Sequence, residues 1–394
     1  MHARIRLSRE PATPLNTNHR FGAASFLVVA IALGGGCASG NDPENIVATK
    51  GGHLFENETF GGNGRTCRTC HSRENGTLTP TQVEALFVSH PGDPLFRSID
   101  SDDGYGNAYT RVREKATIRV TLPLPPNIRI KEDPTATMFT VNRGVPTTLD
   151  ISLTDQVLMA DGRAADLPAQ ALGAIEAHYQ APGPASTADA QAIAAFEATA
   201  GFFSSAATER FARGGAAPEL PAGNTDAEVR GRRFFEPGGQ CAVCHDGPML
   251  NTTSADNAAF GAGSRVESNL VSVNAEPLGL VGGNFTTNAN VDRTWIIAGA
   301  GDNGNDLEIV APDLGIALIT GRRAHVTLFK IQTLRNISQT PPYFRDGSAK
   351  TLNAVVNHYQ KFINAVGDIC DKKTGACNIT DQGKSDLVAF LNLL

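Results

Sequence analysis

Apolar side chains return every three to four residues in several stretches of the chain, which is the spacing of an amphipathic helix. Some of these stretches begin at a residue that favours the N-cap position, such as Thr187, Thr225 or Thr380. The pattern predicts helices over residues 166–180, 187–213, 226–235, 351–366 and 380–394.

The stretch between residues 245 and 323 has a different pattern. It is rich in Gly and Asn and contains short β-branched runs, which predicts long loops with minor strands. The predicted fold class is therefore mainly α, with long loops and minor β-strands.

The first 36 residues read as an export signal. Basic residues precede an apolar run at 21–33, which ends in Gly-Gly-Gly-Cys37, and this order is typical of a segment that directs export. Cys37 is a candidate for lipidation of the bacterial lipoprotein type, with simple cleavage nearby as the alternative. No later run reaches the roughly 18 apolar, uncharged residues that a membrane span needs. The basic residues are Arg4, Arg6, Arg9 and Arg20.

The charge balance argues against nucleic acid as a partner. The chain has 34 basic and 40 acidic residues, and the signal holds four of the basic and one of the acidic residues. The mature chain therefore has 30 basic and 39 acidic residues, a net charge of −9. A surface of this sign repels phosphate backbones.

Two motifs carry the chemistry of the chain: Cys67-Arg-Thr-Cys70-His71 and Cys241-Ala-Val-Cys244-His245. Cys-x-x-Cys-His is the attachment signal of a c-type haem, in which both thiols bind the macrocycle and the His binds the iron. A zinc knuckle would need further Cys or His ligands at short spacing, and none follows. A disulfide or a thioredoxin-like pair leaves the His after both motifs unexplained. The sequence therefore predicts two covalently bound c-type haems.

The surroundings of the two motifs indicate an internal duplication. A Gly-rich segment leads into each motif, at 60–66 and at 234–239, and an Asp-Gly pair followed by a predicted helix comes later in each half, at 161 and at 346. We predict two cytochrome c-like haem domains. The predicted boundaries are 1–36 for the signal, 45–215 for the N-terminal domain and 216–394 for the C-terminal domain.

Two further cysteines, Cys370 and Cys377, flank a short polar segment. In an oxidising compartment they are expected to form a local disulfide that closes a small loop.

The chain resembles the bacterial di-haem cytochrome c peroxidase family, which includes the di-haem enzyme that forms tryptophan tryptophylquinone. Most of the mature chain takes part in the resemblance. Its clearest segments are Glu58-Thr-Phe-Gly-Gly-Asn-Gly-Arg-Thr-Cys67, Leu334-Arg-Asn-Ile-Ser-Gln-Thr-Pro-Pro-Tyr-Phe-Arg-Asp-Gly347, and Asp161-Gly-Arg163 followed by Gln170.

The resemblance implies two unequal haems. It places His71 at the N-terminal haem, which reacts with peroxide, and His245 at the C-terminal haem, which passes electrons to it. It places Gln170 beside the reactive haem. It also implies calcium between the domains, with oxygens from Thr340 and Pro342, although a companion Asn of the family is Gly144 here.

Two departures affect the reactive site. The acid that the family places ten residues after its Gln is Gln180 here, and an amide cannot hold the proton that peroxide cleavage moves. Glu176 or His178 is the alternative. The Trp that the family places between the haems is Ala160.

A third departure affects the second haem. The Met that binds its iron in the peroxidases corresponds to Tyr359, and the quinone-forming enzyme has a Tyr there. Tyr359 is the predicted ligand, with His358, Met249 and Met159 as alternatives.

We therefore expect a periplasmic bacterial oxidoreductase, free or lipid-anchored, that reduces hydrogen peroxide. Its electron donor is expected to be a small protein of cytochrome c or cupredoxin type, and a homodimer is left open. One alternative is a high-valent-haem oxidant of another protein or small molecule. The other is a di-haem cytochrome that only transfers electrons.

Overall fold

Helices predominate in the computed structural model, which describes residues 43–154, 157–252, 254, 270–271, 293–326, 328–366 and 379–394. The mainly helical fold with few, short strands is confirmed. Cys37, Cys370 and Cys377 lie outside the described residues, so the predicted lipidation and disulfide stay predictions. The helices are α1 Pro43–Asn57, α2 Cys67–Cys70, α3 Pro80–Ser89, α4 Thr110–Lys115, α5 Ile151–Thr154, α6 Leu167–Tyr179, α7 Thr187–Glu197, α8 Ala206–Ala212, α9 Asp226–Arg232, α10 Ala317–Thr320, α11 Leu352–Val366 and α12 Asp381–Leu391.

Side chains just before the helices explain where several of them begin. Asp166 accepts a hydrogen bond from Ala169 N at the start of α6, and Thr225 and Glu228 form a capping box at α9. Thr380 Oγ1 accepts a hydrogen bond from Gly383 N at 3.0 Å at the start of α12. The predicted helices in these regions are confirmed to within a few residues.

The prediction of one helix over 187–213 is wrong. Ser186, one residue earlier than expected, caps α7, and the helix ends at Glu197. A 3₁₀ turn at Ala200–Phe202 follows, and Ser205 then caps α8. Ser side chains bond to nearby backbone N–H groups, so a Ser after a turn starts a new helix in place of continuing the old one.

The strands form three small antiparallel sheets. Strand β1 (Thr117–Pro123) pairs with β3 (Met138–Gly144), with Ile118 opposite Arg143. Strand β2 (Ile128–Ile130) pairs with β5 (Arg293–Ile297), and β5 pairs with β6 (Leu307–Ala311). Strand β4 (Leu270–Val271) pairs with β7 (Phe329–Lys330). Strands between 245 and 323 were predicted, whereas the β1–β3 pair in the first half was not.

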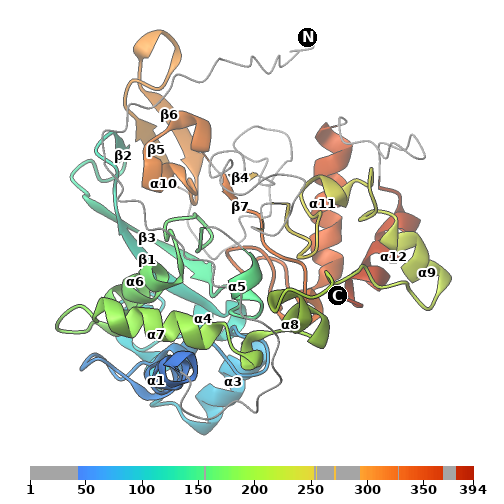
Figure 1. Ribbon diagram of the computed structural model, residues 1–394. Helices are drawn as coiled ribbons and strands as arrows, with labels where there is room; N and C mark the ends of the chain where they lie inside the picture. Colours follow the sequence, from blue (N-terminus) through green and yellow to red (C-terminus); the bar gives the residue numbers. More distant parts are fainter. Residues whose placement is uncertain are drawn as a thin grey trace, which may run out of the picture. The chain divides into compact units, whose positions relative to one another are not determined.

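The apolar core divides into clusters with distinct places in the chain. One joins α1 to α6 and α7 and includes Cys67, and another joins α9 to α11 and α12 and includes Cys241 (Figure 1). A third cluster fills the space between the two larger sheets, around Trp295. The first cysteine of each haem motif therefore packs against a helical core.

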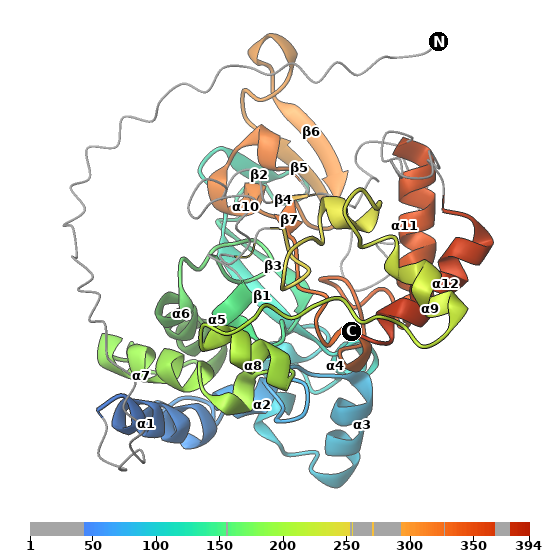
Figure 2. The same ribbon diagram turned by 45° about the vertical axis from the view of Figure 1, so that its right-hand side comes forward.

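The sheet of β2, β5 and β6 crosses the predicted domain boundary at 215/216, because β2 comes from the first half and β5 from the second (Figures 1 and 2). The described residues after 41 form one compact unit. The two-domain division and the internal duplication stay predictions.

A buried ion network holds the first half against the second. On β3, Phe139, Val141 and Arg143 point to the same buried face, as alternate residues of a strand do. Arg143 is 3% exposed and donates to Asp313 through Nε and Nη2, at 3.0 Å each, and to Asp161. Burial opposes charge on Asp313, but Arg143 and Arg345 outweigh it and lower the pKa of Asp313.

Replacing Arg143 with Met is expected to lower the unfolding free energy of the haem-loaded protein by about 3–5 kcal/mol, because two buried carboxylates lose their main partner. Denaturant unfolding measures the change. The matched control is Arg129→Met, which removes an exposed ion pair with Asp306 and should cost less than about 1 kcal/mol. Equal losses of unfolding free energy in the two variants would show that the buried network stabilises the fold no more than an exposed ion pair does.

Candidate haem-binding sites

The imidazoles of the two motifs are held in the same way. His71 Nδ1 lies 2.8 Å from the carbonyl oxygen of Gly76, and His245 Nδ1 lies 2.9 Å from that of Leu250. The carbonyl comes five residues after the His in both cases. A ring that donates Nδ1–H to a carbonyl keeps Nε2 free as a ligand, which is the usual arrangement of a metal-binding His.

Burial keeps both imidazoles uncharged. It lowers the pKa of His71 to about 4, against a smaller opposing effect of the Gly76 carbonyl. Burial likewise lowers the pKa of His245. Neutral imidazole is the form that binds a metal ion, so both side chains suit an iron ligand at neutral pH.

The four motif cysteines are free of disulfides. Burial raises the pKa of Cys67 and of Cys241 to about 12 and that of Cys70 to about 11. A reactive or zinc-bound thiolate needs the opposite shift. Among the described residues, no group of three or more His, Cys, Asp or Glu is arranged to hold a metal ion. An uncharged thioether link to haem fits these buried sulfurs better than zinc does.

A cavity opens beside the first motif. Its empty space, counted with the open solvent at its mouth, is about 1090 Å³. Cys67, Cys70 and His71 form part of its wall, and the remainder is mostly apolar, as a haem macrocycle requires. The residues present therefore fit a haem attached at the first motif.

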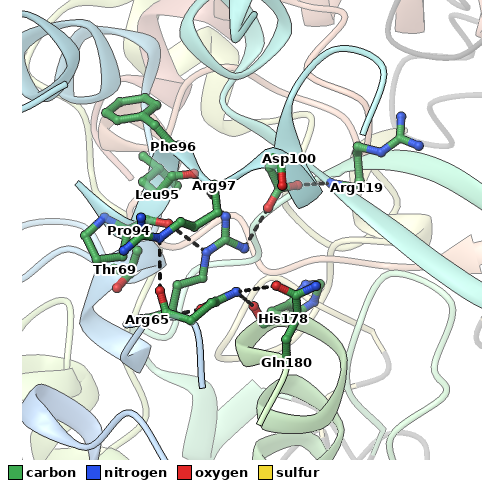
Figure 3. Close-up of polar contacts among 12 residues, drawn as sticks. Arg65, Thr69, Pro94, Leu95, Phe96, Arg97, Asp100, Arg119, His178 and Gln180 are labelled. Atoms are coloured by element: carbon green, nitrogen blue, oxygen red, sulfur yellow. Dashed lines mark hydrogen bonds and ion pairs between the residues drawn. The ribbon is translucent and has the colours of Figure 1, made fainter. Parts of the chain in front are cut away.

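Arg65 anchors the approach to this motif. Its side chain is 1% exposed and donates to Asp100 at 2.7 Å, to the Pro94 carbonyl at 2.9 Å and to the Leu95 carbonyl at 3.0 Å (Figure 3). These bonds fix the chain at Arg65, two residues before Cys67. The position of Arg65 in the cavity wall was not predicted.

One face of α6 forms another part of the wall. Gln170, Ala174 and His178 line the cavity, and their spacing of four residues puts them on the same side of the helix. His178 is 8% exposed, and its Nδ1 has no hydrogen-bond partner. Burial lowers the pKa of His178 to about 4, so the ring is a neutral base at pH 7.

The structure does not bring the other two candidates on α6 into the cavity. Glu176 is exposed and lies outside the cavity lining. Gln180 is also exposed; it ends the helix with a left-handed backbone (φ 53°), and its Oε1 accepts from Asn63 Nδ2 at 3.1 Å (Figure 3). Of the two alternatives to the missing acid, the geometry favours His178 over Glu176.

A further acid of the cavity wall, Glu197, was not predicted. It follows Ala190 and Ile193 on the buried face of α7 and is 3% exposed. The sequence signal was a Glu at the i+7 position of an otherwise apolar helical stripe. Burial raises the pKa of Glu197 to about 8.

Tyr359 lies at the second motif. It is on α11, and its pKa is raised first by burial and then by the neighbouring Cys244 and Cys241 thiols, which places the phenol beside that pair. The ring of Phe344 lies 6.4 Å from that of Tyr359 and 5.0 Å from that of His358. Tyr359 therefore lies near the second motif, and the ligand assignment remains a prediction.

The two Met alternatives have separate surroundings. Met249 is fully buried, and its carbonyl accepts from Thr333 Oγ1 at 2.6 Å. Met159 lines the first cavity.

A single segment connects the two motifs. Lys330, Gln332 and Thr333 line the first cavity, and the backbone of Gln332 also interacts with the imidazole of His245. Lys330 N donates to the carbonyl of Ala160 at 2.9 Å. Trp295 packs in the sheet core, where its Nε1 donates to the Ala311 carbonyl at 2.7 Å, and it lines no part of this cavity.

The predicted calcium ligands lie in a loop with a cis peptide bond between Pro341 and Pro342. Thr340 Oγ1 donates to the Ile337 carbonyl at 3.3 Å, and Gly144 N donates to the Arg345 carbonyl at 2.6 Å. Calcium stays a prediction.

One curated relative matches part of the chain. Cytochrome-c peroxidase IdrP1 of Denitromonas iodatirespirans is 26% identical over 168 residues, which is 42% of this chain and 39% of that protein. The resemblance to the bacterial di-haem cytochrome c peroxidase family is thus confirmed. The match spans about two fifths of the relative's length, and no family model matches the chain.

Two solved structures resemble the course of this chain. A MauG-like protein associated with microbial copper homeostasis is 20% identical, with a TM-score of 0.48 over 89% of this chain and 88% of that one. The diheme peroxidase BthA from Burkholderia thailandensis is 15% identical, with a TM-score of 0.42 over 89% of this chain and 85% of that one. Both scores are below 0.5, so the likeness is distant.

If Tyr359 binds the second iron, Tyr359→Phe should change the ferric absorption spectrum of one haem and raise its reduction potential, because an anionic oxygen ligand favours the ferric state. Tyr343→Phe is the matched control, since Tyr343 packs against the core to which α11 contributes and burial is the cause of its raised pKa. Unchanged spectra in Tyr359→Phe would exclude it as a ligand.

Proposed function

We propose that this chain is an exported di-haem c-type oxidoreductase that reduces hydrogen peroxide with electrons from a small donor protein. One observation carries the proposal. Two Cys-x-x-Cys-His motifs hold their imidazoles in the same ligand-ready geometry, and the first opens on a cavity that contains the unpartnered base His178. Bound haem would supply the iron that exchanges electrons with peroxide.

His178 is assigned the proton transfer. Reduction of hydrogen peroxide to two waters consumes two electrons and two protons, and the oxygen–oxygen bond breaks more easily if the leaving oxygen is protonated. A neutral imidazole nitrogen of His178 would take the proton from one peroxide oxygen and return it to the other. Gln170, on the same helix face, can orient the peroxide by a hydrogen bond but cannot hold the proton.

Electrons are proposed to enter at the second motif and to reach the first through residues 330–333. The backbone of Gln332 interacts with the imidazole of His245. Gln332 also lines the first cavity, together with Lys330 and Thr333. This route replaces the aromatic relay that Ala160 removes.

The periplasm is the proposed location, from the export signal. In the described part of the chain, no helix is long and apolar enough to cross a bilayer. The net charge of −9 would attract a basic donor of cytochrome c or cupredoxin type. Lipidation at Cys37, bound calcium and a homodimer are proposed as further properties.

A second candidate function is electron transfer without peroxide chemistry. His178 shares the cavity with His71, and its free ring nitrogen could bind the same iron on the opposite face. That arrangement would close the site, since two imidazoles leave no position for peroxide.

Replacing His178 separates the two candidates. As a proton-transfer base, its loss in His178→Gln should lower kcat for peroxide by roughly 10²–10⁴-fold while the haem spectra stay close to those of the unmodified protein. Glu176→Gln should keep full turnover, because that side chain is exposed outside the cavity. A change from low-spin to high-spin ferric haem in His178→Gln would instead identify His178 as an iron ligand.

The pH profile gives an independent check. The reactive form of His178 is the deprotonated ring, and burial lowers its pKa to about 4. Steady-state turnover should therefore stay level from neutral pH down to about pH 5 and fall as the pH passes through about 4. A fall that begins near the ordinary pKa of His, about 6.5, would contradict the buried, neutral imidazole.

A further inference from the structure

Glu197 is a buried acid that the proposed peroxide chemistry does not use. Its side chain is 3% exposed and lines the first cavity, and its Oε2 has no hydrogen-bond partner. The residues one and two turns earlier on the same face of α7, Ile193 and Ala190, are apolar and fully buried. An ionised carboxylate at this position would have little in the protein to stabilise it.

The carboxyl group lies close to the edge of the first motif. Its charge contributes to the raised pKa of the Cys67 thiol, after burial and against the hydrogen bond from Tyr179. Cys67 would carry one thioether link of the proposed haem. Glu197 therefore faces the side of the cavity at which the macrocycle would be attached.

Charged groups on the neighbouring helices have other partners. Lys50 of α1 pairs with Asp189 at 2.8 Å, and Arg68 of α2 pairs with Glu56 at 2.7 Å. The pKa of Glu197 is raised to about 8 by burial. The other titratable groups that line the cavity with Glu197 are Arg65, Cys67, Cys70, His71, His178, Tyr179 and Lys330.

The iron of the proposed haem would supply a positive charge in the same cavity as Glu197. Ferric haem carries one positive charge more than ferrous haem, and in a buried site this charge acts strongly on a nearby carboxylate. Oxidation favours the ionised acid, whereas reduction removes the charge that stabilised it. The coupling is reciprocal, so protonation of the acid must also make the iron easier to reduce.

We propose that Glu197 is the redox-linked proton acceptor of the first haem site. When the haem in that cavity takes up one electron, Glu197 takes up one proton from solvent, and the net charge of the buried site stays constant. On oxidation the electron and the proton leave together. The inference rests on the covalent haem of the proposed function and does not require peroxide turnover.

The reduction potential of the first haem, measured against pH by spectroelectrochemical titration of the haem-loaded protein, tests this. The component that is lost when Cys67 and Cys70 are both replaced with Ala identifies the first haem. Its potential should fall between about pH 6 and 10 by up to ~59 mV per pH unit, a tenfold change in the redox equilibrium per unit. In Glu197→Gln the slope should vanish in this range.

The matched control is Glu209→Gln, which removes an exposed acid that pairs with Arg213 on α8 and should keep the full slope. A second measurement needs no variant: on reduction, the infrared difference spectrum should gain a protonated-carboxyl band. A flat potential in the unmodified protein, or an unchanged slope in Glu197→Gln, would overturn the proposal.

The outcomes separate this inference from the proposed function. A slope that depends on Glu197 in a protein without peroxide turnover would support the proton acceptor and reject the peroxidase. Turnover with a pH-independent potential would do the reverse. A protein without covalent haem at Cys67 and Cys70 would reject both.

Discussion

Arg143 forms a buried ion network that joins the two halves of the protein, in addition to the pairing of β2 with β5. Its guanidinium is almost fully buried and lies between Asp161 of the first half and Asp313 of the second. Asp161 also pairs with Arg163 at 2.8 Å, and Arg345 lies 3.6 Å from Asp313. Buried charges are tolerated only with close partners, so these segments cannot separate without a large cost.

The network also shapes the first cavity. Asp161, a member of the network, directly follows Ala160, and the Ala160 carbonyl accepts a hydrogen bond from Lys330 N. This contact holds Lys330, Gln332 and Thr333 in the cavity wall. The same segment reaches His245 through Gln332. A structural ion network and the proposed electron route therefore share one set of contacts. The motifs Asp161-Gly-Arg163 and Arg345-Asp346-Gly347, far apart in sequence, are both explained by this arrangement.

The surroundings of the motifs make the two haem sites unequal. The first has an accessible cavity with a neutral base, His178, and a buried acid, Glu197. At the second, the phenol of Tyr359 lies beside Cys241 and Cys244, where it would bind the iron as its sixth ligand. The proposed function assigns peroxide to the first of these sites and electron entry to the second.

Local signals in the sequence predicted much of this. The haem motifs depend on contiguous residues, and the caps at Asp166 and Thr225 act within three residues, so both could be predicted without tertiary contacts. The break after Glu197 was missed because an Ala-rich pattern continues across it.

The side chains of the cavity were harder to predict. Glu176 and His178 are two residues apart on α6, and only the direction in which the helix packs decides which of them faces the cavity. Arg65 and Arg143 are buried through partners distant in sequence, which periodicity does not reveal.

The central claim is that the first site reacts with peroxide and the second supplies the electron. Absorption spectra of the half-reduced protein, recorded before and after one equivalent of hydrogen peroxide, test it most directly. We expect a high-spin first haem and a low-spin reduced second haem, with the second oxidised as peroxide is consumed. Two low-spin haems whose spectra do not change with peroxide would contradict it.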